Sequence, residues 1–139
     1  MFTKIAIAHD GSAGAAKAFS AALIIAAEHG AELHIVCVEE TPRIPASIDE
    51  VIEDTQGAKR QFDKLCGHCR ADAKRKQIDL HPHILAGHAV PKICEFVQHN
   101  GCDLLIVGYM GHSALYNRLI GSTTDRLVEH APCAVLVVK

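Results

Sequence analysis

Five short apolar segments recur along the chain, and longer segments with helical patterning separate them. The apolar segments cover residues 4–9, 32–38, 79–86, 102–108 and 134–138, and the third is the weakest. The helical segments run over about 12–29, 48–76, 90–99 and 122–131. Strict alternation predicts a parallel sheet, because each right-handed crossover lays a helix across it. The expected fold class is therefore α/β, a doubly wound five-stranded parallel sheet with helices on both faces.

Length and composition bound the possible functions. A chain of 139 residues suits a single domain, expected over 1–139. With 49% apolar and 22% charged residues the chain should fold. The net charge of -2 provides no general attraction to nucleic acid or to an anionic membrane surface, so neither is an expected partner. No apolar run approaches a signal peptide or a membrane span, and a cytoplasmic location is expected.

Two irregular segments, 39–45 and 108–124, follow predicted strands, where doubly wound sheets bind ligands. The second reads GYMGHSALYNRLIGSTT and ends at the start of a predicted helix. Free amides at such a start form an anion site, and Ser122 is expected to cap the helix as well. Neither GxxxxGK[ST] nor a GxGxxG after the first strand occurs, which argues against a P-loop enzyme or a Rossmann dehydrogenase.

Asp10 follows the first strand, where its carboxylate could accept a hydrogen bond from a ribose hydroxyl or a base amine. The alternative is an ordinary Asp-Gly turn before a helix. Gly108 and Gly111 present the same choice between close approach to a ligand and a tight turn.

These residues together resemble the universal stress proteins, and specifically their ATP-binding branch. The resemblance rests on IAIAHDGS at 5–12, LHIVCV at 33–38, GHAVPKI at 87–93 and the long segment 103–138. The branch's spacing of Gly, two residues, Gly, nine residues, Gly and Ser or Thr is met by Gly108, Gly111, Gly121 and Ser122. The resemblance implies a Rossmann-like sheet of strand order 3-2-1-4-5, related to the adenine nucleotide alpha hydrolases. It also implies a ligand between the first and fourth strands.

The ligand that the resemblance implies is ATP with Mg²⁺, and AMP or ADP remains an alternative. Ala8 and Val38 are similar to adenine contacts, and Asp10 to the acid near the ribose and base. The glycines of the signature would fold over the ribose, and the helix start would hold the phosphates. The positions so assigned are Ala8, Asp10, Gly11, Val38, Val107, Gly108, Gly111, His112, Ser113, Gly121, Ser122 and Thr123.

Two histidines depart from the family pattern. His9 stands where a small or β-branched residue is usual, and His112 where a basic residue is common. A neutral imidazole attracts phosphate less than a guanidinium does. If His112 faces the phosphates, ATP affinity should therefore strengthen as this side chain protonates.

Three functions remain open. The first is a stress-response regulatory module in which nucleotide occupancy changes conformation or partner binding, with no catalytic residue assigned. The second is a slow ATPase. The third is a zinc or redox sensor built from Cys66, Cys69, His81 and His83. Against this sensor, helical spacing places Cys69 on an apolar stripe, which predicts a core thiol and no metal site.

The last predicted strand, 134–138, carries no charge. Left unpaired at a sheet edge it would be an aggregation hazard. The resemblance implies that it pairs across a two-fold axis, so a homodimer is expected, and a covered edge in a monomer is the alternative.

Overall fold

The computed structural model describes residues 1–40, 47–110 and 120–139. Strands and helices alternate through this part of the chain, as the sequence predicts. They are β1 (Lys4–Ala8), α1 (Ala13–His29), β2 (Glu32–Glu40), α2 (Ile48–Arg75), β3 (Leu80–Gly87), α3 (Ala89–Asn100), β4 (Leu104–Gly108), α4 (Ser122–His130) and β5 (Ala134–Val138). No helix in these ranges is long and apolar enough to cross a membrane.

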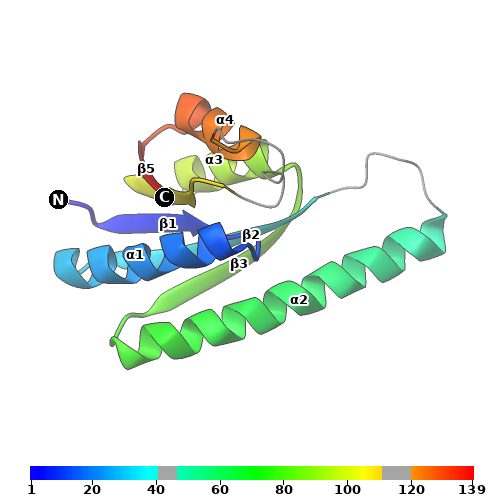
Figure 1. Ribbon diagram of the computed structural model, residues 1–139, viewed down its shortest axis with the longest axis horizontal. Coiled ribbons are helices and arrows are strands. Elements are labelled where there is room, and N and C mark those ends of the chain that lie inside the picture. Colours follow the sequence, from blue (N-terminus) through cyan, green and yellow to red (C-terminus); the bar gives the residue numbers. More distant parts are fainter. Residues whose placement is uncertain (41–46, 111–119) are drawn as a thin grey trace.

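The strands form one parallel sheet of order β3-β2-β1-β4-β5, which confirms the predicted fold class and strand order. Central β1 pairs with β2 on one side and β4 on the other, with Ile5 opposite Leu33 and Leu104. Helices α1 and α2 cover one face, and α3 and α4 lie on the other (Figure 1). The connections reverse direction between β1 and β4, so ligand binding is expected at the carboxyl ends of these strands.

Alternating strand side chains build two separate cores. Ile5 and Ile7 of β1 face α1 and α2, whereas Ala6 faces α3 and α4. The alternation follows from the two-residue period of a strand. Small alanines on β1 at the second face leave room there, close to the ends of the strands.

Local signals explain where the elements begin and end. Ser12 caps α1 by accepting a hydrogen bond from the amide of Ala15, and Gly30 ends the helix with φ of +62°. The expectation that the segment from residue 39 onward is irregular is wrong for Glu39 and Glu40. Both extend β2, because they pair with the end of β3 and sheet pairing outweighs the low strand preference of Glu.

Candidate functional site

A cavity lies at the carboxyl ends of β1, β2 and β4, where the chain reverses direction in the sheet. Its volume is about 370 Å³, a size typical of small-molecule sites. The residues that line it are Ala8, His9, Asp10, Ser12, Ala15, Val36, Val38, Glu40, Phe62, Ala89, Ile93, Val107, Gly108, Met110, Gly121, Thr123, Thr124 and Leu127. Most of these side chains are apolar, so the wall suits a flat ligand with an apolar face.

Carboxylates are the charged groups of the described lining. They belong to Asp10 and Glu40, and no lysine or arginine joins them within the described residues. An anionic ligand therefore depends on backbone amides, on a bound cation or on groups outside the described ranges.

Local hydrogen bonds shape the turn between β1 and α1. The amide of Gly11 donates to Nδ1 of His9 at 3.0 Å, and the amide of Ser12 donates to Oδ1 of Asp10 at 2.9 Å. The Ser12 hydroxyl accepts from the amide of Ala15 at 3.2 Å. Gly11 has φ of +86°, a left-handed conformation that favours glycine. These contacts hold Asp10 beside the cavity and begin the helix. Asp10 therefore belongs to an Asp-Gly turn and also lines the cavity.

The imidazole of His9 is buried at this turn, with 4% relative exposure. Its backbone amide donates to the carbonyl of Val36 at 3.0 Å, and its ring lies 6.3 Å from the ring of Phe19 on α1. Burial lowers the pKa of His9, and the nearby carboxylate of Asp10 opposes this only in part. The ring is therefore neutral at pH 7, with Nδ1 as the acceptor for Gly11.

The start of α4 closes against the end of β4. Gly121 donates from its amide to the carbonyl of Tyr109 at 3.0 Å, and Thr124 donates from Oγ1 to the carbonyl of Gly108 at 2.7 Å. The expectation that Ser122 caps this helix is wrong. Gly121 is the N-cap, because its carbonyl accepts the first helical hydrogen bond, from the amide of Asp125 at 2.9 Å.

Within the described residues, no side chain caps the start of α4. The amides of its first turn, which no intrahelical carbonyl can reach, are those of Ser122, Thr123 and Thr124. Both Ser122 and Thr123 are exposed, but Thr123 lines the cavity and Ser122 does not. The positive end of the helix dipole therefore faces the cavity and favours an anion there.

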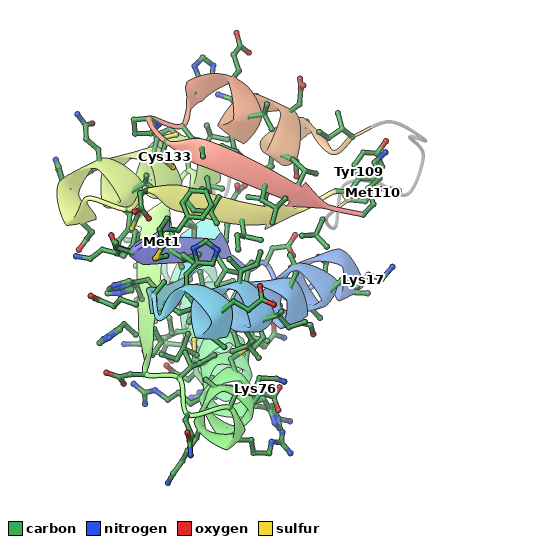
Figure 2. All side chains as sticks on the ribbon, turned by 90° about the vertical axis from the view of Figure 1, so that its left-hand side faces the viewer. Met1, Lys17, Lys76, Tyr109, Met110 and Cys133 are labelled. Carbon is green, nitrogen blue, oxygen red and sulfur yellow. The ribbon has the colours of Figure 1, made fainter. Side chains whose placement is uncertain are left out.

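Gly14 is a glycine that sequence reasoning missed. A Cβ at Gly14 would lie 2.3 Å from the carbonyl oxygen of Met110, and a Cβ at Gly108 would lie 2.8 Å from the carbonyl carbon of Gly14. Two glycines thus allow the start of α1 to pack on the end of β4. Figure 2 shows Tyr109 and Met110 at the end of β4 beside β5, and the Tyr109 amide donates to the Val138 carbonyl at 2.8 Å.

The structure brings together most predicted binding positions that it describes. Those that line the cavity are Ala8, Asp10, Val38, Val107, Gly108, Gly121 and Thr123. Gly11 lies in the turn beside Asp10 but does not line the cavity, and neither does Ser122. Gly111, His112 and Ser113 lie outside the described residues.

Apolar side chains from several elements complete the wall, and sequence reasoning did not assign them. They are Val36 of β2, Phe62 of α2, Ala89 and Ile93 of α3, and Leu127 of α4. Ala89 and Ile93 are one helical turn apart and follow the end of β3. That spacing is the signal that could have placed them at the same edge of the sheet.

The residues of the zinc alternative lie on opposite faces of the sheet. Cys66 and Cys69 are buried in the core under α1 and α2, beside Cys37. His83 instead contacts Phe96 of α3, on the other face. Burial raises the pKa of Cys69 to about 12, so this thiol stays protonated, whereas zinc and oxidants react with the thiolate. No group of three or more His, Cys, Asp or Glu side chains that could hold a metal ion is found among the described residues.

The histidines on β3 form a cluster with β2 instead. Nδ1 of His34 lies 2.9 Å from Nε2 of His83, and Nε2 of His34 lies 2.6 Å from Oε1 of Glu32. The ring of His81 stacks on His34 at 4.8 Å, and His83 packs against Phe96 at 4.5 Å. An ionised Glu32 can only accept, so neutral His34 donates from Nε2 and accepts at Nδ1 from His83.

Comparison with known proteins agrees with this architecture. A family model described as the Universal stress protein family matches residues 1–139. A universal stress protein of Methanocaldococcus jannaschii is 31% identical over 148 aligned positions, which cover 100% of this chain and 83% of that protein.

Solved structures share the fold. The UspA protein of Lactobacillus plantarum has a TM-score of 0.92 at 27% identity, over 99% of this chain and 97% of that one. A universal stress protein family protein of Arabidopsis thaliana, solved with AMP bound, has a TM-score of 0.75 at 21% identity. That alignment covers 99% of this chain and 91% of the other.

Proposed function

The chain belongs to the universal stress protein family, and from this premise we propose that it is an adenine-nucleotide-binding module in a stress response. Nucleotide occupancy would change the conformation that a partner protein recognises. One observation carries the proposal: an apolar cavity at the switch between β1 and β4 has a carboxylate, Asp10, on one side and the start of α4, with glycine as its N-cap, on another. The AMP held by the Arabidopsis thaliana relative supports the same ligand class.

The chemistry of the cavity wall suggests a separate place for the adenine, the ribose and the phosphates. The adenine would lie against the apolar side chains of Ala8 and Val38, where a flat ring loses the least by leaving water. The ribose hydroxyls would donate to Asp10. The phosphates would lie at the first turn of α4, where the amides of Thr123 and its neighbours can donate.

ATP with Mg²⁺ is the proposed ligand, with AMP or ADP as alternatives. Mg²⁺ prefers oxygen ligands and is usually held by one or two carboxylates together with phosphate oxygens. Asp10 is proposed for the ribose, so Glu40 is the carboxylate of the described lining that could join the phosphate oxygens in holding a Mg²⁺. The cation would also offset the negative charge that these two side chains bring near the phosphates.

A charge substitution at the start of α4 tests the placement of the phosphates. Thr123→Glu adds a carboxylate where the phosphates would lie, while acidic residues at a helix start stabilise the fold. We expect it to weaken ATP binding by at least about tenfold in calorimetric titration, since like charges repel at close range. Ser122→Glu is the matched control, because it adds the same charge at an exposed neighbour that does not line the cavity. Equal effects of the two substitutions, or none from either, would contradict the placement.

A slow ATPase is the alternative function. Phosphoryl transfer to water needs a group that orients or deprotonates the water beside the terminal phosphate. The carboxylates of the described lining belong to Asp10, which is proposed for the ribose, and to Glu40. Phosphate release slower than about 1 per second fits a binding module, and faster turnover would indicate a dedicated enzyme.

We also propose that β5 pairs with its copy in a homodimer. Within the described residues β5 pairs only with β4, and it forms one edge of the sheet. Leu136 on this strand keeps 37% of its surface exposed. Pairing across a two-fold axis would satisfy the open backbone groups of the edge and cover this side chain.

A further inference from the structure

The His9 ring contacts the turn that carries Asp10, and it does so from within the protein. Its Nδ1 accepts the amide of Gly11 at 3.0 Å, two residues along the chain. That amide belongs to the peptide unit between Asp10 and Gly11, so the bond determines how this unit is oriented. Asp10 follows His9 directly, and its own carboxylate accepts the Ser12 amide at 2.9 Å.

The bond also determines the conformation of Gly11. This residue has φ of +86°, and its amide points back toward the end of β1. Without an acceptor at His9, the amide would lose its partner at a half-buried position and the turn would be free to relax. Relaxation would displace Asp10 and the cap of α1 together, since Ser12 both donates to Asp10 and caps the helix.

We propose that His9 is a positioning residue for the nucleotide site proposed above, and that the site requires its neutral imidazole as the acceptor that holds Asp10 in place. A protonated ring carries a hydrogen on both nitrogens and can no longer accept from Gly11. Two N–H groups would then point at each other. The turn would open, and nucleotide affinity would fall with acidification.

The groups around the ring do little to stabilise a positive charge on it. From α1 the ring faces Phe19, and from α2 Phe62 lines the same cavity. On β2, Cys37 keeps its proton because burial raises its pKa. Asp10 is the charged group that favours the imidazolium, and burial outweighs it, so the pKa of His9 is lowered. Loss of affinity is therefore expected below about pH 6.5, the ordinary pKa of histidine.

Two variants distinguish the loss of the hydrogen-bond acceptor at residue 9 from the protonation of His9. His9→Asn keeps an acceptor that can take the amide two residues along, as in an Asx-turn, and cannot be protonated near neutral pH. His9→Leu removes the acceptor. ATP affinity is measured by calorimetry from pH 5.5 to 8 for the wild-type protein and both variants. The phosphates of ATP and all other histidines titrate alike in the wild-type protein and in His9→Asn, so the ratio of their Kd values isolates His9.

We expect His9→Asn to bind like the wild-type protein at pH 8. Below the pKa of His9, the wild-type Kd should rise relative to that of His9→Asn by up to about tenfold per pH unit, the limit for one linked proton. His9→Leu should bind weakly at every pH while circular dichroism shows it folded. A Kd ratio that does not change with pH would overturn the role of His9 and leave the nucleotide site standing. A wild-type protein that does not bind ATP at pH 8 would overturn both.

Discussion

Acid should destabilise the protein through the histidine cluster on β2 and β3. Neutral His34 donates to Glu32 and accepts from His83. One added proton can be accommodated if His83 changes tautomer and accepts from His34. A second proton leaves two N–H groups facing each other, beside a stacked His81. Burial lowers the pKa of both His34 and His83, which agrees with this geometry.

The sign and size of the effect of pH on stability follow from proton linkage. The pKa of each ring in the folded protein lies below its ordinary value of about 6.5, so the unfolded chain binds more protons as the pH falls below that value. The stabilisation is therefore complete at higher pH and lost on acidification. Each proton excluded from the fold costs about 1.4 kcal/mol per pH unit. Because the cluster accommodates one proton and resists the second, the slope that it contributes is at most about 1.4 kcal/mol per pH unit.

His83→Gln tests this estimate. The Gln amide can donate to Nδ1 of His34, or rotate and accept from it, and it does not titrate. The free energy of unfolding is measured by urea denaturation between pH 5 and 7, a range in which Glu32 stays ionised because its pKa is lowered. We expect a flatter pH dependence than that of the wild-type protein. His68→Gln on the exposed side of α2 is the control and should not change it. Equal slopes for the wild-type protein and His83→Gln would refute the reasoning.

Three further substitutions test the fold and the assembly. Gly14→Ala should cost about 1–3 kcal/mol in urea denaturation, since its Cβ would lie 2.3 Å from the Met110 carbonyl oxygen; an unchanged stability would contradict the close packing. Asp103→Ala should cost about 1–2 kcal/mol by the same assay, because the carboxylate accepts three hydrogen bonds from the segment that leads into β1. Leu136→Lys should convert a dimer into a monomer in light scattering, whereas Val128→Lys, also exposed, should not; a dimer that survives Leu136→Lys would argue against pairing through β5.

The predictable part of the fold depends on signals that act locally. Strand segments such as 5–8 and 134–138 are continuous apolar runs, and Ser12 and Gly30 mark the ends of α1 by their own chemistry. Where the prediction failed, a partner distant in sequence decides the outcome. Glu39 and Glu40 are strand residues because β3 lies beside them, which their own preference opposes.

In the candidate site, too, the sequence predicted positions set by local signals and missed those set by contacts with distant segments. Asp10 and Gly108 could be placed at the cavity, because the carboxyl ends of β1 and β4 meet where the sheet order reverses. Ser122 was misassigned as a cap, since the bond from Asp125 to Gly121 depends on how α4 leaves the end of β4. Gly14 could not be found from spacing, because its need for a missing Cβ arises from contact with a different strand end.

The central claim is that the cavity at the ends of β1 and β4 holds an adenine nucleotide. Mass spectrometry of small molecules released from the purified protein, followed by calorimetric titration of the emptied protein with ATP and AMP, tests it most directly. The account predicts an adenine nucleotide at up to one per chain, and saturable binding when that nucleotide is added back. A protein that retains no nucleotide and binds none on titration would contradict it.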